Sequence, residues 1–112
     1  MGLTEKSCVP CQGGIEPMER EAAQAFLVQT PGWQLSEDGL SIHRRFPFKN
    51  FIKAMSFAVK TGELAEREGH HPVITIGWGY CIIVFKTAKI KGLHENDFIM
   101  AAKVNAHFEH VE

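Results

Sequence analysis

Residues 48–87, FKNFIKAMSFAVKTGELAEREGHHPVITIGWGYCIIVFKT, contain a helical pattern that stops abruptly and is followed by two strand-like runs. Apolar side chains recur every three or four positions over residues 48–68, which predicts an amphipathic helix, and Gly69 follows as its stop. Residues 73–76 and 80–87 are rich in Val, Ile, Thr and aromatic side chains, which predicts two strands joined by a glycine-containing turn. This helix followed by a hairpin decides the fold class.

The flanking segments repeat the alternation of helix and hairpin. Residues 18–29 favour a helix that Pro31 and Gly32 end, and residues 94–110 favour a last helix. Residues 33–35 and 40–46 lie on either side of a turn sequence, which predicts a second hairpin. The order helix, two strands, helix, two strands, helix predicts an α+β domain, a four-stranded antiparallel sheet with three helices on one face.

The length of the chain, 112 residues, is enough for one compact domain and too small for two. We assign residues 18–112 to this single domain. Residues 1–17 are polar and interrupted by Gly and Pro, which predicts a loosely ordered, flexible N-terminal arm. The apolar surface of the 48–68 helix is wider than one core-facing stripe, so we expect it also to form an oligomer contact.

The charge balance excludes several classes of partner. Twelve basic and thirteen acidic residues give a formal net charge of -1, which offers no bulk attraction to nucleic acid or to an anionic membrane surface. No apolar run approaches the length of a membrane span, and the N-terminus lacks the apolar core of a signal peptide. Together with an odd number of cysteines, three, these features favour a cytoplasmic protein.

The cysteines do not form a convincing metal site. Cys8 and Cys11 have CxxC spacing, but no second pair with matching spacing exists, and Cys81 lies in a predicted strand among apolar residues. The chain also lacks a phosphate-binding glycine loop and a serine-hydrolase elbow. We therefore predict no metal and no cofactor.

Among the six histidines, adjacent His70 and His71 are the candidates for chemistry. Pro72 biases the residue before it toward extended backbone, so the pair is rigidly presented, and imidazole can donate or accept a proton near neutral pH. The alternative is a helix-terminal histidine beside a surface histidine, and spacing alone favours that alternative. We interpret His94 as a helix-start cap, and His107 as a cation near a helix C-terminus.

A resemblance raises the histidine pair above this alternative. Glu66, His70-His71-Pro72 and Trp78, separated by three and five residues, resemble the first half of the signature of the pterin-4a-carbinolamine dehydratases. The other matching stretches are GLHENDF at residues 92–98, which includes Asp97, PGW at 31–33 and FPFKNF at 46–51. The resemblance covers nearly the whole chain, and the N-terminal CxxC arm is similar to that of bacterial members.

The resemblance implies dehydration of a 4a-hydroxytetrahydropterin to the quinonoid dihydropterin, the recycling step beside aromatic amino-acid hydroxylases, in a homodimer or homotetramer. It implies His70 and His71 as the catalytic acid and base, without metal or redox cofactor. Pro72, Trp78 and Asp97 are implied in substrate binding, with Trp78 as a pocket wall. Asp97 could equally stabilise the start of the last helix electrostatically, and both roles are compatible.

One position departs from the family pattern. In the family pattern, nine residues separate the tryptophan from a further histidine. Nine residues after Trp78 in this chain are followed by Ala88 instead. Alanine can neither donate nor accept a proton. Two classes therefore stay open: a dehydratase that depends on the histidine pair, and a dehydratase-like pterin-binding or protein-interaction module that has lost turnover.

Overall fold

The computed structural model describes residues 2–9 and 15–110. Its elements, in chain order, are η1 Leu3–Glu5, α1 Arg20–Leu27, β1 Gln34–Leu35, β2 Ile42–Pro47, α2 Phe51–Glu68, β3 Val73–Gly77, β4 Tyr80–Phe85, η2 Ala88–Ile90 and α3 Glu95–Phe108, where η marks a short 3-10 helix. The predicted alternation of helices and hairpins is confirmed. None of the described helices is both long and apolar enough to span a membrane.

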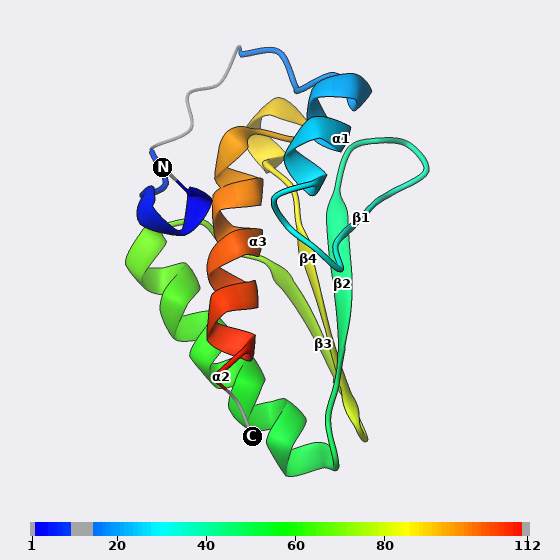
Figure 1. Cartoon of the computed structure of the whole chain (residues 1–112), viewed down its shortest axis with the longest axis vertical. Helices are drawn as coiled ribbons and strands as arrows, with labels where there is room; N and C mark the ends of the chain where they lie inside the picture. The colour runs from blue at the N-terminus through cyan, green and yellow to red at the C-terminus, as the bar shows by residue number, and fades with distance from the viewer. Residues whose placement is uncertain (1, 10–14, 111–112) are drawn as a thin grey trace.

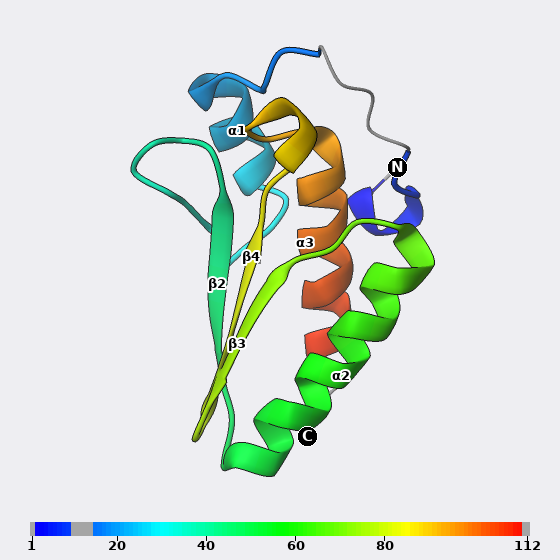
Figure 2. The same cartoon turned by 180° about the vertical axis from the view of Figure 1, so that it is seen from behind.

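The four strands form one antiparallel sheet in the order β1-β2-β4-β3. Figure 1 shows the three α-helices on the same side of this sheet, and Figure 2, the view from behind, shows α2 running alongside β3. Every second residue of β4 is buried beneath the helices, as the two-residue period of a strand requires. The predicted α+β architecture is confirmed.

Helix α2 begins three residues later than predicted because Asn50 caps it. The Asn50 side chain accepts a hydrogen bond from the Lys53 amide at 2.9 Å. At the other end Gly69 takes a left-handed conformation, φ 68°, which a residue without a side chain adopts at little cost. The buried face of α2 carries Phe57, whose ring packs 4.8 Å from that of Phe46 on β2.

Helix α3 is the most buried helix and joins the other elements. The ring of Phe98 stacks on Phe26 of α1 at 5.0 Å, which fixes α1 to its N-terminal half. Near its C-terminal end, the buried Asn105 side chain binds three groups from the first hairpin. Its Oδ1 accepts hydrogen bonds from Trp33 Nε1 at 2.8 Å and Arg44 Nη1 at 2.7 Å, and its Nδ2 donates to the Pro31 carbonyl at 2.9 Å.

Part of the segment predicted as a loosely ordered arm lies against α3. The Leu3 side chain of η1 is 4 % exposed and belongs to the hydrophobic core. The Lys103 ammonium on α3 donates to the Thr4 carbonyl at 3.1 Å. Figure 1 shows η1, in dark blue, beside α3 and the upper end of α2. The N-terminal residues 2–9 are therefore placed to form a wall at that end of the domain.

We expect Asn105→Ala to lower the free energy of unfolding by about 2 kcal/mol, because the buried indole N–H of Trp33 loses its acceptor. Urea unfolding followed by circular dichroism measures the change. Gln24→Ala, on the exposed side of α1, is the control and should stay within about 0.5 kcal/mol of the original protein. Equal stability of the two variants would contradict the role assigned to Asn105.

Candidate active site

The corner between α2 and β3 directs His70 into the molecule. Gly69 turns the chain, and the His70 amide donates to the Ala65 carbonyl at 3.2 Å, which closes the last turn of α2. The His70 side chain is only 11 % exposed, and its ring stacks on Phe85 of β4 with a centroid separation of 6.0 Å. Packing on one side and the helix end on the other therefore hold this imidazole in place.

Asp97, in the first turn of α3, is fully buried and accepts hydrogen bonds from three directions. His70 Nε2 donates to Oδ1 at 2.6 Å, while the Thr87 hydroxyl at 2.8 Å and the His94 amide at 3.0 Å donate to Oδ2. A buried carboxylate needs such donors because burial removes it from water. The side chain therefore stabilises the start of α3, as one interpretation of the sequence expected, and it also binds His70. Asp97 does not line the hollow described below, and its contact with a substrate stays a prediction.

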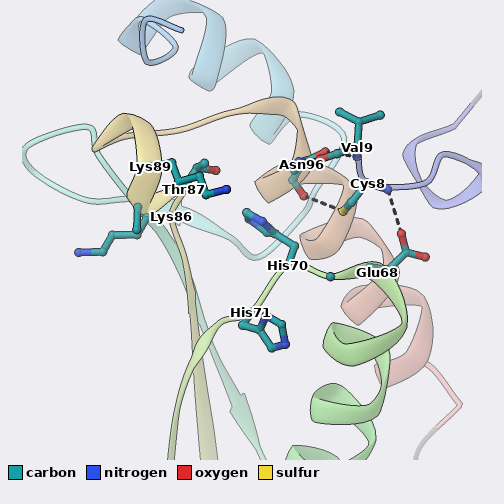
Figure 3. Close-up of a pocket in the computed structure, with 11 residues that line it drawn as sticks. Cys8, Val9, Glu68, His70, His71, Lys86, Thr87, Lys89 and Asn96 are labelled. Carbon is teal, nitrogen blue, oxygen red and sulfur yellow. Dashed lines mark hydrogen bonds between the residues drawn. The ribbon is translucent and has the colours of Figure 1, made fainter. Parts of the chain in front are cut away.

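His71 has a different environment from His70. Its Nε2 is hydrogen-bonded to Glu66 in the last turns of α2, and both side chains are largely exposed. Figure 3 shows the His70 and His71 rings pointing away from one another. His70 therefore faces the buried carboxylate, whereas His71 stays in exchange with solvent.

A hollow of about 540 Å³ opens where the two histidines meet the end of β4. This volume lies within the range typical of small-molecule sites. Figure 3 shows most of its lining side chains. The lining residues are Cys8, Val9, Glu68, Gly69, His70, His71, Lys86, Thr87, Ala88, Lys89 and Asn96. The position that departs from the family pattern, Ala88, therefore lies on the same hollow as the histidine pair.

The N-terminal segment forms one wall of this hollow. The Asn96 side chain pairs with the backbone of Val9, accepting at 3.0 Å and donating at 2.7 Å. The Cys8 amide donates to Glu68 Oε1 at 2.9 Å. Burial is the larger cause and the nearby Glu68 carboxylate the smaller one of a raised pKa of the Cys8 thiol, about 12. Cys8 therefore lines the hollow as a neutral thiol rather than as a thiolate.

The predicted CxxC pair cannot be judged as a pair, because Cys11 lies outside the described residues. Cys81 is buried in the core, as predicted. Within residues 2–9 and 15–110, no group of three or more His, Cys, Asp or Glu side chains is arranged to hold a metal ion.

Trp78 and Pro72 do not line the hollow. Trp78 is 73 % exposed in the turn between β3 and β4, and Figure 2 shows that turn at the opposite end of β3 from the α2–β3 corner. A five-residue strand spans roughly 16 Å, so Trp78 is too far away to wall this hollow within its own chain. His94 caps α3, as predicted, because its Nδ1 accepts from the Asn96 amide at 3.0 Å.

Sequence reasoning missed Thr87, Asn96 and Glu68 as parts of the site. A pattern for Thr87 was present, since Cys81, Ile83 and Phe85 are buried on alternate positions and Thr87 continues that series. Asn96 and Glu68 had no such pattern, because their partners Val9 and Cys8 lie 87 and 60 positions away in the chain.

Comparison with known sequences identifies the relatives of this chain. Residues 16–107 match the family described as pterin 4 alpha carbinolamine dehydratase. A protein of Halorhodospira halophila is 57 % identical over 106 residues, covering 95 % of this chain and 97 % of its own. A protein of Methylococcus capsulatus is 58 % identical over 103 residues, covering 92 % and 90 %. Both relatives are named, provisionally, as pterin-4-alpha-carbinolamine dehydratases.

Two solved structures resemble the chain. A transcriptional coactivator/pterin dehydratase from Brucella melitensis has a TM-score of 0.76 and 28 % identity, covering 81 % of this chain and 97 % of its own. A pterin dehydratase-like protein identified as a RuBisCO assembly factor in the alpha-carboxysome has a TM-score of 0.59 and 24 % identity, covering 72 % and 93 %. The second likeness concerns the fold alone.

We expect the Nε2 atom of His70 to carry the hydrogen of the neutral ring, because an Asp97 carboxylate can only accept. In Asp97→Asn the amide can donate instead, and the ring should shift toward the Nδ1–H tautomer. Long-range proton–nitrogen NMR of the imidazole rings distinguishes the two forms. The ring of His43 on β2 serves as the internal control and should not change. A His70 ring without a hydrogen on Nε2 in the original protein would contradict this geometry.

Proposed function

Because the chain belongs to the pterin 4 alpha carbinolamine dehydratase family, we propose that it dehydrates a 4a-hydroxytetrahydropterin to the quinonoid dihydropterin. In this proposal it serves tetrahydropterin recycling beside an aromatic amino-acid hydroxylase. The observation that carries the proposal is the hollow of about 540 Å³ that both His70 and His71 line. Two groups that transfer protons near neutral pH thereby border one cavity of suitable size for a bicyclic ring.

The reaction defines what the side chains must do. The bond between C4a and its hydroxyl oxygen breaks, the oxygen takes up a proton and leaves as water, and N5 loses its proton as the C4a–N5 double bond forms. One acid near the hydroxyl and one base near N5 are therefore required, each within hydrogen-bond reach of its atom. The step neither consumes nor produces electrons, so it needs no redox partner.

His70 is suited to act as an acid or base whose ring is held in a fixed orientation. Its Nε2–H is bound to the buried Asp97 carboxylate, so Nδ1 is the nitrogen left to exchange a proton with the substrate. Asp97 acts through His70, as a positioning residue, and stabilises the imidazolium when it forms. His71 fits the complementary part, because its exposed ring can return protons to water.

The remaining implied residues fit this proposal unequally. Pro72 supports the site by restricting the backbone conformation of His71. Trp78 could contact a pterin only in an oligomer, if a second copy brought its hairpin to the hollow. The exposed apolar side chains of α2 are consistent with the homodimer or homotetramer that we expect. They include Phe51, Ile52 and Val59, at 46 %, 69 % and 57 % exposure.

Ala88 supports a second candidate function. It is exposed on the hollow, at the position where the family pattern has a third histidine, and its methyl group cannot transfer a proton. A chain that kept the scaffold without this ring could bind pterins, or act in a protein complex, without turnover. Pterin binding with no acceleration of dehydration would favour this alternative.

The decisive measurement is the rate of 4a-hydroxytetrahydropterin dehydration with the original protein and with His71→Ala. We expect acceleration by the original protein, and a rate for the variant that is lower by about two orders of magnitude, since one member of an acid–base set is lost. His43→Ala, a change in a β2 strand residue, is the matched control. A rate with the original protein no better than the uncatalysed one would remove the enzyme proposal.

Ala88→His tests whether the departure limits turnover. The exposed position can accept a larger side chain, and a restored imidazole on the hollow should raise kcat by about tenfold or more. Ala88→Phe, a ring without a titratable proton, is the control and should not raise it. An unchanged kcat in Ala88→His would mean that another group already fills the role of the missing imidazole.

A further inference from the structure

Two hollows border the small side chain of Ala88. The first, of about 540 Å³, contains the histidine pair. The second, of about 240 Å³, is lined by Asp38, Leu40, Ser41, Lys86, Ala88 and Lys91. Lys86 and Ala88 border both hollows, so the two adjoin at the methyl group of Ala88.

The surroundings of this junction are rich in positive charge. Residues 86–91, which include Ala88, contain three lysines. Lys86 lines both hollows, Lys89 lines the first and Lys91 lines the second. Figure 3 shows the Lys86 side chain pointing away from His70 and out of the first hollow. Its ammonium group lies near Asp38, and it adds to the Ser36 and Leu40 hydrogen bonds that lower the pKa of that carboxyl group.

The carboxylates that border the hollows are already engaged. Asp38 Oδ1 accepts from the Ser36 hydroxyl at 2.6 Å and from the Leu40 amide at 3.0 Å, so it serves its own turn. Glu68, on the far wall, accepts from the Cys8 amide and lies 3.5 Å from the Lys103 ammonium. The lysines beside Ala88 therefore outnumber the carboxylates beside it, and an anion placed there would gain attraction.

The loop that presents these lysines is well fixed. The backbones of Thr87 and Gly92 bind each other reciprocally, at 2.8 Å and 3.4 Å, and Ile90 is buried between them. Lys91 has a φ of 55°, the one positive value outside glycine among the described residues. Such a conformation is uncommon for a residue with a side chain and is retained where the surroundings impose it. It holds Lys91 on the second hollow.

The chemistry of the substrate relates these lysines to the reaction. In a tetrahydropterin, C6 is bonded to N5, so a substituent on C6 leaves the ring beside the atom that must face a histidine. With the ring in the first hollow, Ala88 leaves space for such a substituent to pass toward Lys86 and Lys91. On the basis of the function proposed above, we infer that this site takes pterins whose C6 substituent carries an anionic group, such as a carboxylate or a phosphate.

Binding of stable oxidised pterins to the full chain tests this inference. Quenching of the pterin fluorescence measures the binding. The neutral probe is 6-hydroxymethylpterin, and the anionic probes are pterin-6-carboxylate and the longer pteroylglutamate. At low salt we expect at least one anionic probe to bind about three- to tenfold more tightly than the neutral one. The difference should shrink in about 0.5 M salt, because exposed charges are screened.

Variants connect the preference to these side chains. Lys86→Gln combined with Lys91→Gln should abolish the preference, because the affinities for the anionic probes should fall to that for 6-hydroxymethylpterin. Lys49→Gln, an exposed lysine before α2 at the opposite end of the domain, is the matched control and should keep the preference. Equal affinities for all three probes, or a preference that survives the double substitution, would overturn the inference while the proposed function stands. If none of the three probes binds, the inference fails, and the proposed function is still decided by the dehydration rate.

Discussion

The burial of one carboxylate, that of Asp97, is the constraint on which the rest of the site depends. A fully buried carboxylate is costly unless donors surround it, and here the donors come from three separate elements. Thr87 follows β4, His70 follows α2, and the His94 amide precedes α3. Satisfying this one group therefore fixes the end of the sheet, the helix-to-strand corner and the start of α3 relative to each other. The His70 ring is oriented because it supplies one of the hydrogen bonds to the buried Asp97 carboxylate.

The N-terminal segment extends this arrangement into a cavity. Cys8 and Val9 line the hollow together with His70, so this segment closes one of its sides. The segment is held at its start by the buried Leu3 and at its end by the paired amide of Asn96. Asn96 is the neighbour of Asp97, so the same helix start that orients the histidine also fixes the wall. A helix N-terminus provides such donors readily, because its first amides have no partners within the helix.

Ala88 is a position where the fold and the proposed chemistry make different demands on the side chain. Position 88 is exposed and makes no demand on the core, so the fold tolerates alanine there as well as histidine. The proposals above therefore assign the effect of this position to proton transfer and to the choice of pterin, while the architecture stays that of the family.

The sequence by itself determined the order of the elements, the α+β class and the family, because hydrophobic periodicity, helix stops and the His70 to Asp97 motif are local patterns. It also placed the caps of α3 correctly. It misjudged His107, expected as a helix-end cation: the ring stacks on Phe57 at 5.0 Å, and burial lowers its pKa.

Only the tertiary structure decided which motif residues share a cavity. It brought His70, His71 and Ala88 onto one hollow and set Asp97 behind His70. It left Trp78 at the far end of β3, and it added Thr87, Asn96 and the N-terminal wall. The physical reason is that these contacts join residues up to 99 positions apart, and their partners are selected by packing and by the need to satisfy buried polar groups. No local pattern along the chain records that selection.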